Sequence, residues 1–550
     1  MTSQKISSHW LKDLLSLTLL LGILFTCFLG SRPLLTPDEG RYVEIPREMV
    51  VSGDYLTPHL NGLKYFEKPP LFYWLETVPV RLFGIHEGGL RSVSVLLGII
   101  GCLMVYAAGR ILYTRRTGWL ASLVLSTSLL YFVFAHLIIP DIVVSICLTG
   151  CLLAFILGTQ TARRGKQVAY FWSMYAFAAL AVLSKGLIGV IFPGMIIFAW
   201  LCLTRNWKQL KTYCIPTGLV LFLLIAAPWH ILVQLKNPEF FQFYFIDQQF
   251  LRYFTDYADR GQPFWFFPAT IFLGFFPWIF FFPWQLNLRL LRQNAVELFL
   301  VLWALLITLF FTFSHSLLIS YALPVMPALA LLTGRYLANI WSLPRPSGQL
   351  KLRFILIALG LLSIAIVGKL LIKPSDPVSW YLILGLLVLS AVATFVTGFK
   401  NVRIGILTLM VSFSFCLISI NLSYKNLDNR SVKPLAQVLL PRLTADTPVV
   451  TYQGYFQDLP VYLQRRIIVA HYEGELAFGM AHQNTTGWVL SEQQFWNLWR
   501  TAPRAYAIMG LKMYHQLPEM EIDAWTAAGK PPLYPVSQTG KNILVTNRPL

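Results

Sequence analysis

Long apolar runs separated by short polar connections fill most of the chain. Each run is near the length that an α-helix needs to cross about 30 Å of hydrocarbon. The pattern therefore predicts an α-helical polytopic membrane protein with about thirteen transmembrane helices. The predicted spans are residues 13–30, 90–112, 118–138, 140–160, 169–186, 187–204, 213–235, 264–285, 296–315, 317–340, 353–372, 378–398 and 403–422.

Three polar segments leave the membrane on the same side. They are a first outer loop at 31–89, a second outer loop at 236–263 and a tail at 423–550. In the tail, short β-branched or apolar runs alternate with predicted helices such as 492–499. The runs are residues 449–452, 467–471, 488–490, 506–509 and 543–546. We therefore predict a membrane domain at 1–422, which includes the two outer loops, and a small α/β domain at 423–550.

The first outer loop begins with a stretch that is amphipathic at helical spacing. Ile45 and Met49 fall on one face, which predicts a short amphipathic helix lying at the outer membrane surface. Glu44, Arg47 and Glu48 belong to the same stretch. We interpret these three charged side chains as a solvated face.

Composition agrees with the membrane assignment. Hydrophobic residues make up 56% of the 550 residues and charged residues 13%, whereas soluble domains carry about a quarter charged residues. The formal charge of +19 does not indicate nucleic-acid binding, because the basic residues form small clusters between spans. All seven cysteines fall in or beside apolar runs, so no disulfide framework is predicted.

The basic clusters also predict an orientation. They follow the even-numbered spans, as Arg115 and Arg116 follow the second span and Lys166 follows the fourth. The short odd-numbered connections are nearly uncharged or mixed in sign. Since connections rich in lysine and arginine stay in the cytoplasm, we predict a cytoplasmic N-terminus and an outer tail.

The first outer loop also holds carboxylates and a lysine that suit the chemistry of a lipid-linked sugar phosphate. Asp38 and Glu39 follow Pro37, a few residues beyond the first span, and Lys68 lies directly before Pro69. Breaking a sugar–phosphate bond leaves negative charge on the departing phosphate, which a cation in a partly dehydrated site stabilises. A carboxylate can accept the acceptor's proton, or orient the acceptor, without any metal.

Further candidates lie at the predicted outer ends of spans. Asp141 either interacts with the dipole of the helix that it begins or forms a second acidic site. Lys185 either binds phosphate or extends its amine to the membrane surface. Tyr321 is either a phosphate contact or an interfacial aromatic residue. Arg41 in the first outer loop and Arg252 in the second are additional cations for a phosphate.

Several short motifs together resemble a known family. They are Pro-Asp-Glu-Gly-Arg-Tyr at 37–42, Tyr-Phe-Glu-Lys-Pro at 65–69, Leu-Ser-Lys-Gly at 183–186, Ser-Tyr-Ala-Leu-Pro at 320–324 and Asp-Leu-Pro-Val-Tyr-Leu at 458–463. The series resembles the polyprenyl-phosphate-dependent glycosyltransferases of the GT-C class. It resembles more closely the aminoarabinose-transferase-like branch, which modifies lipid A. This resemblance covers most of the chain and implies a thirteen-span bundle with an outer C-terminal domain.

The resemblance also implies a function. It implies an inverting transfer of a sugar from undecaprenyl phosphate to lipid A or another periplasmic acceptor. The enzyme would be a monomer surrounded by membrane lipid in the inner membrane of a Gram-negative bacterium. By motif, Asp38 matches the essential aspartate of the first loop and Lys68 matches the phosphate-binding lysine. Asp141 matches the second acidic position, and Tyr321 matches a contact of the donor phosphate.

Two positions depart from the family pattern. Gly40 stands where aminoarabinose transferases usually have threonine. Asp247 and Gln248 stand where some relatives have an acid–histidine pair. The resemblance therefore leaves open whether Glu67 is a ligand of a divalent metal.

Two other functions remain open. One is a protein O-mannosyltransferase-like enzyme, in which Asp38 would act as the base for a hydroxyl acceptor. The other is a transporter or flippase of a lipid-linked sugar. Transporters tend to place ionisable residues near the midplane of the membrane, whereas Asp141 and Lys185 lie at predicted outer ends of spans. That placement favours chemistry at the membrane surface.

Overall fold

The computed structural model describes residues 9–251, 261–283, 294–343, 345–423, 430–519 and 532–549. Contacts divide the chain into two compact units. We call the first the membrane unit; it comprises Met1–Leu29, Glu67–Phe72 and Arg91–Ser423. We call the second the loop–tail unit; it comprises Gly30–Phe66, Tyr73–Leu90 and Tyr424–Leu550. Most of the first outer loop therefore belongs to the same unit as the tail.

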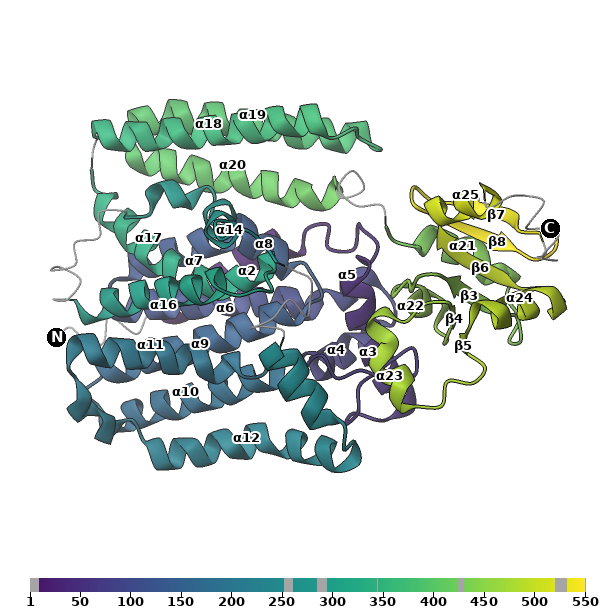
Figure 1. Ribbon diagram of the computed structural model, residues 1–550. Coiled ribbons are helices and arrows are strands. Elements are labelled where there is room, and N and C mark those ends of the chain that lie inside the picture. The colour runs from purple at the N-terminus through teal and green to yellow at the C-terminus, as the bar shows by residue number, and fades with distance from the viewer. Residues whose placement is uncertain are drawn as a thin grey trace. The chain divides into compact units, whose positions relative to one another are not determined.

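The membrane unit is a bundle of helices, and Figure 1 shows the long ones running side by side. Its helices are α2 (Trp10–Thr26), α6 (Ser92–Leu112), α7 (Arg115–Ser126), α8 (Leu129–Ala135), α9 (Pro140–Gln160), α10 (Arg164–Lys185), α11 (Ile188–Thr204), α12 (Ile215–Lys236), α14 (Phe266–Gly274), α16 (Ala295–Thr312), α17 (Met326–Ile340), α18 (Gly348–Leu371), α19 (Pro377–Lys400) and α20 (Val402–Leu422). Shorter 3-10 or π-helical segments are η1 (Trp207–Thr212), η2 (Gln242–Leu251), η4 (Trp278–Phe281) and η5 (Ile319–Val325). Nearly every side chain of α9 is buried, because this helix packs against α6, α10 and α11.

Among the described residues, eight helices are long and apolar enough to cross a membrane. A ninth span is counted if α7 and α8 are joined. Each predicted span contains a helix or a pair of helices, although α2 and α11 have only 17 residues each. The prediction of a polytopic helical membrane protein is confirmed at the level of eight or nine candidate spans.

The predicted span 118–138 is bent in the middle. It consists of α7 and α8, whose axes differ by 67°. Thr127 and Ser128 lie at the bend, and their hydroxyls donate to backbone carbonyls four residues earlier at 2.5 and 2.7 Å. Hydroxyl side chains that bond in this way often bend a helix. A hydropathy pattern does not report such a bend, because both halves are apolar.

Prolines interrupt two other predicted spans. In 264–285, α14 is separated from η4 by Pro277, and in 317–340, η5 contains Pro324 and precedes α17. Proline has no amide hydrogen to continue the helical ladder, and its ring clashes with the preceding turn. Each of these predicted spans is therefore two shorter helical pieces.

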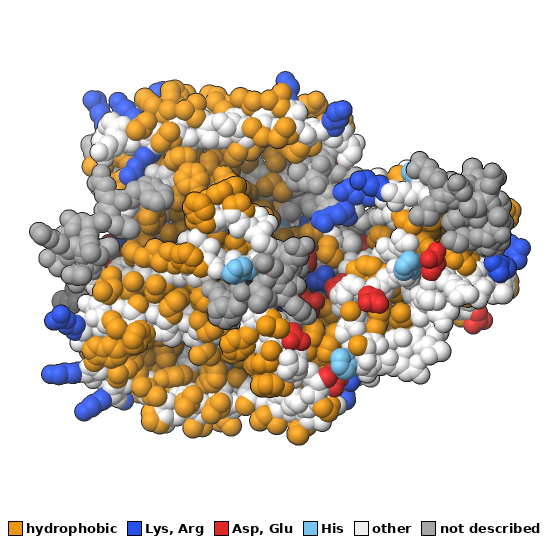
Figure 2. Space-filling model, viewed as in Figure 1, with side chains coloured by type: hydrophobic (Ala, Val, Ile, Leu, Met, Phe, Trp, Pro, Cys, Tyr) orange, Lys and Arg blue, Asp and Glu red, His pale blue; other side chains and the backbone are white. Residues whose placement is uncertain are grey.

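The surface of the membrane unit matches its apolar composition. In Figure 2, hydrophobic side chains cover most of the visible flank of the long helices, and lysine and arginine side chains gather near helix ends. Large apolar side chains such as Leu224, Leu371 and Val378 are more than two-thirds exposed. An apolar flank of this extent is typical of a surface that contacts lipid.

The tail folds into a six-stranded sheet with helices packed on it. The strands are β3 (Val449–Tyr452), β4 (Ile468–Ala470), β5 (Val489–Leu490), β6 (Tyr506–Gly510), β7 (Tyr534–Gln538) and β8 (Asn542–Thr546), in the spatial order β5-β4-β3-β6-β8-β7. The first four strands of that order are parallel; β8 pairs antiparallel with β6, and β7 pairs antiparallel with β8. Helix α24 (Glu492–Thr501) buries Phe495 and Trp499 in the core beside Tyr452. The predicted small α/β domain is confirmed.

The other elements of the loop–tail unit are short. In the first outer loop they are α3 (Asp38–Ser52), the hairpin strands β1 (His59–Leu60) and β2 (Leu63–Lys64), α4 (Leu71–Phe83), which begins in the membrane unit, and α5 (Glu87–Leu90). In the tail they are α21 (Lys433–Leu439), η7 (Leu440–Arg442), α22 (Leu459–Leu463), η8 (Gly474–Leu476), α23 (Ala477–His482) and α25 (Leu511–Glu519). Helix α3 packs against both β1 and α22.

This packing overturns the interpretation of Glu44, Arg47 and Glu48 as a solvated face, and with it the picture of α3 as an amphipathic helix at the outer surface. Glu44 is fully buried, and the Arg47 guanidinium donates to its two oxygens at 2.7 and 2.5 Å. Glu48 accepts the backbone N–H of Gly62 at 3.0 Å. The charged side of α3 faces other parts of the loop–tail unit, where the charges pair with each other and with the backbone.

Candidate active site

A cavity of about 220 Å³ lies within the membrane unit. Its walls come from the junction of α10 and α11, from η2, from the end of α16 and from η5. The polar lining residues are Lys68, Lys185, Gln248, Gln249, Ser314, Ser316 and Tyr321. The apolar lining residues are Leu187, Ile188, Ile191, Phe250, Phe310 and Phe311. We call this cavity the lysine pocket, because it brings the predicted site residues Lys68, Lys185 and Tyr321 to one place.

Asp141, Lys185 and Tyr321 form a compact group beside this pocket. Asp141 lies in the first turn of α9, Lys185 is the last residue of α10, and Tyr321 lies in η5. The Lys185 Nζ atom is 2.5 Å from the Asp141 Oδ1 atom and 4.1 Å from the centroid of the Tyr321 ring. The two charged side chains are each only 12% exposed. Three segments far apart in the sequence therefore fix one ammonium group at the edge of the cavity.

Gly186 allows α10 to end directly after Lys185. Its φ of +82° lies in the left-handed region that favours glycine. A Cβ atom here would lie 2.6 Å from the Tyr244 hydroxyl and 2.7 Å from Gln249 Nε2. The Ser-Lys-Gly motif is visible in the sequence, but it predicts no role for this glycine or for Gln249.

Lys68 reaches the lysine pocket from the short segment of the first outer loop that belongs to the membrane unit. Its Nζ atom donates to the backbone carbonyl of Glu67 at 2.9 Å. The next two residues, Pro69 and Pro70, are buried. Because proline fixes φ, this pair limits the directions in which the lysine can point.

The second outer loop contributes two amides to the pocket. Gln248 and Gln249, on η2, line the lysine pocket. Arg252, predicted to bind phosphate, lies outside the described residues. The described part of the chain contains no group of three or more His, Cys, Asp or Glu side chains that could hold a metal ion. Glu67 and the Gln248 amide do not make up a metal-ligand set, so no step below is assigned to a metal.

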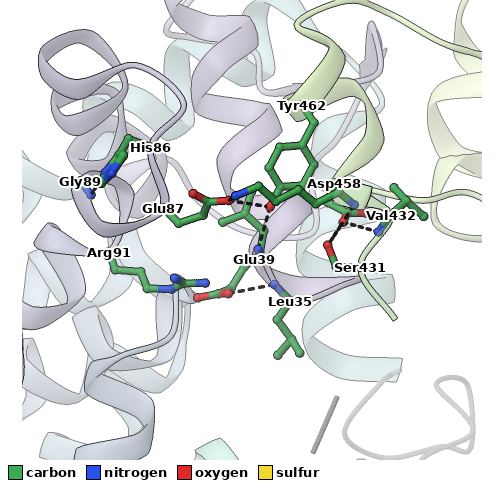
Figure 3. A network of polar contacts seen from close by, with 12 residues as sticks. Leu35, Glu39, His86, Glu87, Gly89, Arg91, Ser431, Val432, Asp458 and Tyr462 are labelled. Carbon is green, nitrogen blue, oxygen red and sulfur yellow. Dashed lines mark hydrogen bonds and ion pairs between the residues drawn. The ribbon is translucent and has the colours of Figure 1, made fainter. Parts of the chain in front are cut away.

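In the loop–tail unit, the adjacent carboxylates Asp38 and Glu39 have opposite environments. The Asp38 side chain, at the start of α3, is 51% exposed and lies 3.8 Å from Arg41. The Glu39 side chain is fully buried, accepts hydrogen bonds from Arg32 at 2.7 and 3.2 Å, and also accepts the Leu35 N–H at 2.9 Å. Figure 3 shows Glu39 turned toward Leu35. Only Asp38 of the two has a carboxylate that a substrate can reach.

Arg41, predicted to bind phosphate, is held within the loop–tail unit. Its Nε atom lies 2.5 Å from the Glu475 Oε2 atom, and its side chain is 14% exposed. Glu475 belongs to η8 of the tail and also accepts a hydrogen bond from Gln457. The strongest contact of Arg41 is thus a link between α3 and the tail.

Family models match two parts of the chain. The model of the dolichyl-phosphate-mannose-protein mannosyltransferase family matches residues 67–232. The model of the aminoarabinose transferase C-terminal domain matches residues 435–531. The first match covers Lys68, Asp141 and Lys185, and the second covers most of the sheet of the tail.

Individual relatives share one name, undecaprenyl phosphate-alpha-4-amino-4-deoxy-L-arabinose arabinosyl transferase. The protein of Aeromonas salmonicida is 29% identical over 64% of this chain and 64% of its own length. That of Erwinia tasmaniensis is 31% identical over 56% of each chain, and that of Pectobacterium carotovorum is 29% identical over 68% of each. The alignments with the first two relatives span less than two thirds of those proteins.

Solved structures extend the match to nearly the whole chain. The crystal structure of ArnT from Cupriavidus metallidurans bound to undecaprenyl phosphate has a TM-score of 0.85 and 26% identity, and the match covers 98% of both chains. The apo structure of the same protein gives a TM-score of 0.82. The chain is ArnT-like: it matches ArnT over nearly its whole length.

In this ArnT-like chain, Gly40 permits a close approach between α3 and the tail. A Cβ atom at position 40 would lie 2.5 Å from the Asp458 backbone nitrogen and 2.7 Å from the Gln457 carbonyl carbon. No side chain fits at such a distance from rigid backbone. The family pattern has threonine at this position. Glycine is present here because the tail segment that precedes α22 lies too close for a side chain.

The motif at 458–463 holds the chain segment that leads into Asp38. Asp458 is fully buried, and one of its carboxylate oxygens accepts from the Ser431 hydroxyl at 2.7 Å and the Val432 N–H at 2.9 Å. Burial raises the pKa of the Asp458 carboxyl to about 6. The Tyr462 hydroxyl accepts the Leu34 N–H at 2.8 Å.

The Tyr462 hydroxyl is itself held in place by the carboxylate of Glu87. The hydroxyl donates to Glu87 of α5 at 3.2 Å, and Lys433 of α21 also bonds to Glu87. Sequence reasoning quoted Tyr462 as part of a motif but did not identify this contact. The ArnT-like loop–tail unit thus uses the tail to position the backbone just before Asp38.

Proposed function

We propose that this chain transfers a sugar from a polyprenyl-phosphate donor to an acceptor outside the cytoplasm. The observation that carries the proposal is the lysine pocket, where two lysines and a tyrosine adjoin an apolar wall. A polyprenyl phosphate has a matching division into an anionic head and an apolar tail. The undecaprenyl phosphate named with the ArnT structure has this chemistry.

Lys68, Lys185 and Tyr321 are proposed to hold the donor phosphate. When the bond between the sugar and the phosphate breaks, charge builds on the departing oxygen, and fixed ammonium groups in a partly dehydrated site stabilise it. Asp141 holds the Lys185 ammonium at 2.5 Å. This ion pair keeps Lys185 in position and balances its charge before the donor binds.

The apolar side of the pocket is proposed to receive the first isoprene units of the donor. Ile188, Ile191 and Phe311 supply aliphatic and aromatic surface directly beside the two lysines. Moving an apolar chain from water onto such a surface is favourable by about 25 cal/mol per Å² buried. This contact would select a lipid-linked phosphate over a soluble sugar nucleotide.

Asp38 is proposed as the catalytic carboxylate, and Glu39 as the residue that fixes the loop around it. The acceptor oxygen forms a bond to the anomeric carbon while the bond from that carbon to the phosphate oxygen breaks, which inverts the anomeric centre. An ionised phosphate acceptor needs no base, so Asp38 would then orient it and stabilise positive charge on the sugar. A hydroxyl acceptor would give its proton to Asp38.

The sugar and acceptor are proposed from the relatives. Their shared name specifies 4-amino-4-deoxy-L-arabinose carried on undecaprenyl phosphate. We propose the same or a related sugar as the cargo and lipid A as the acceptor. Protein O-mannosylation is a second candidate, favoured by the mannosyltransferase match over residues 67–232; the match of the tail at 435–531 favours the first.

The topology that accompanies this proposal has thirteen spans, a cytoplasmic N-terminus and a periplasmic tail in a bacterial inner membrane. It counts α2, α11, the bent α7–α8 pair and the two pairs divided by proline as spans. Residues 1–422 would carry the catalytic membrane domain and 423–550 the periplasmic domain of a monomer. The basic clusters after even-numbered spans support this orientation.

The direct test is transfer by the purified full-length chain. We expect lipid A incubated with undecaprenyl-phosphate aminoarabinose to gain the sugar, as measured by mass spectrometry. A gain only on a polypeptide acceptor would replace the first candidate by the second. If neither acceptor gains sugar while the lipid-linked donor crosses a vesicle bilayer, the protein is a transporter and the proposal is wrong.

A further inference from the structure

A second cavity, of about 900 Å³, opens in the membrane unit and shares no lining residue with the lysine pocket. Its walls come from the first turns of α7, the end of α17 and the start of α20. Arg115 and Arg116 contribute from α7 and Arg335 from α17. We call it the arginine cavity. The positive-inside pattern assigns the start of α7 to the cytoplasmic side.

The charges around the arginine cavity do not cancel. Arg115 binds Asp13 through two contacts of 2.7 and 2.5 Å, but Arg110 binds the same carboxylate at 2.6 Å. Arg335 is paired with Glu297. The two carboxylates, Asp13 and Glu297, are therefore shared among three arginines. Arg116 adds a fourth positive charge.

Arg116 is an exposed cation of the cavity. Its side chain has no ion-pair partner among the residues that the structure describes, and it stands one residue from the paired Arg115. An unpaired guanidinium presents up to five N–H donors in a planar fork, which matches the oxygens of a phosphate. The cavity thus holds an excess of positive charge that an anion can neutralise.

Apolar side chains also line the cavity, beside the polar Thr114, Thr117 and Asn339. Leu120 and Leu123 continue along α7, and Leu407 of α20, 46% exposed, stands in the wall formed by that helix. Trp119 and Trp341 also line the cavity. Tryptophan is enriched where a membrane meets water, because its ring is apolar and its N–H is polar. A soluble anion would leave Leu407, Trp119 and Trp341 uncovered, whereas an amphiphile would cover them.

We propose that the arginine cavity binds one anionic phospholipid, with its phosphate at Arg116 and Arg335 and its acyl chains along α7 and α20. Basic pockets between transmembrane helices on the cytoplasmic side bind anionic headgroups in this way. The cavity has room for a glycerol phosphate headgroup, and its apolar wall continues toward the lipid-facing surface of α20, where Val411 is 58% exposed. This site is independent of the proposed transfer reaction.

The test is native mass spectrometry of the full-length chain released from nanodiscs of equal phosphatidylglycerol and phosphatidylcholine. We expect the wild-type chain to retain phosphatidylglycerol preferentially. Arg116→Ala should weaken this retention about fivefold, since one basic residue near the membrane surface contributes about 1 kcal/mol toward anionic lipid. Lys166→Ala is the matched control, because Lys166 is also an exposed basic residue in the first turn of a helix, α10, but does not line the cavity.

A second variant acts by volume instead of charge. Ala338→Trp would fill the cavity from α17 while keeping every arginine, and it should also reduce retention of phosphatidylglycerol. Equal retention of the two lipids by the wild-type chain would overturn the proposal. So would equal effects of Arg116→Ala and Lys166→Ala, or complete displacement of the lipid by inorganic phosphate, which would identify a site for a soluble anion.

Discussion

The lysine pocket of the membrane unit and the first half of α3 in the loop–tail unit use charged side chains in opposite ways. In the pocket, Lys185 is held by a single carboxylate and still lines a cavity. In α3, Glu39 and Glu44 are fully buried, and their oxygens are bound by arginines and backbone. The comparison shows that a charged side chain is available for chemistry only where the protein leaves part of it open to a cavity or to solvent. A charged residue next to it in the sequence can be fully buried and serve the fold alone.

The largest expected effect separates Asp38 from Glu39. Asp38→Asn should lower the turnover of sugar transfer about 10²- to 10⁴-fold, the range for a lost acid–base group, with an unchanged melting temperature. Glu39→Gln should instead destabilise the fold by about 3 to 5 kcal/mol, because it breaks a buried ion pair with Arg32. Transfer assays and thermal unfolding of the purified chain measure both outcomes.

The reverse pattern would contradict the comparison. If Asp38→Asn unfolds the chain, or if folded Glu39→Gln loses transfer as completely as Asp38→Asn, the two carboxylates do not have the separate roles assigned here. Turnover is to be normalised to the folded fraction of each variant, so that a loss of stability is not counted as a loss of catalysis.

Lys68 should give the next largest effect. Lys68→Met removes a cation from the pocket and should lower turnover about 10²- to 10³-fold, the range for one lost donor to developing negative charge. The matched control is Lys373→Met, since Lys373 is an exposed lysine of the membrane unit that does not line the pocket. Similar losses in the two variants would mean that the effect is not specific to the pocket.

Gly40 tests the loop–tail unit by packing alone. Gly40→Thr would force a side chain against the backbone of Gln457 and Asp458, and overpacking of this kind costs about 1 to 3 kcal/mol. We expect a lower melting temperature and a several-fold loss of transfer, because the contact supports the segment that leads into Asp38. Gly53→Thr is not a suitable control, since its φ of +73° adds backbone strain. Gly385→Ala is suitable, because nothing lies within 4 Å of its Cβ position.

The smallest expected effect is a pH dependence of the loop–tail unit. Burial raises the pKa of Glu48 from 4.5 to about 8, so the folded unit keeps a proton that the unfolded chain releases above about pH 4.5. The stabilisation is therefore complete below pH 4.5 and is lost as the pH rises to about 8. Burial also raises the pKa of Glu44, which gives a contribution of the same sign.

Glu48→Gln isolates one part of this dependence. The amide oxygen can still accept the Gly62 N–H, but the side chain no longer titrates. The fall in melting temperature between pH 5 and pH 8 should be smaller in the variant than in the wild-type chain. An unchanged fall would assign the pH dependence to other groups.

The helices could be predicted because lipid leaves the chain few alternatives. Each apolar run became a helix or a pair of helices, since a backbone in hydrocarbon must satisfy its own hydrogen bonds. The apolar run at 449–452 was correctly predicted as a strand. It is apolar throughout because all four side chains of β3 are buried, as in a sheet that is covered on both faces. The bend at Thr127 was missed because its cause is a pair of side-chain hydrogen bonds within an apolar stretch.

The candidate site was predicted unevenly. Lys68 was singled out by its place in the first outer loop, and Lys185 and Tyr321 by their positions at predicted span ends. The structure brings all three to one cavity, and their roles stay predictions. The burial of Glu44 could not be predicted, because it depends on packing between the first outer loop and the tail. Asn61 shows the range of those contacts, since it exchanges two hydrogen bonds of 3.0 Å with Ile467, 406 residues away.

The central claim is that the lysine pocket binds the phosphate of a polyprenyl donor. Its most direct test is equilibrium binding of radiolabelled undecaprenyl phosphate to the purified full-length chain, with Lys185→Met compared with Lys369→Met. Both are lysines in the last turn of a helix, but only Lys185 lines the pocket. A hydrogen bond to a charged group contributes about 1.5 to 3 kcal/mol, so Lys185→Met should weaken binding at least tenfold while Lys369→Met leaves it unchanged. Equal affinity of all three proteins would contradict the account.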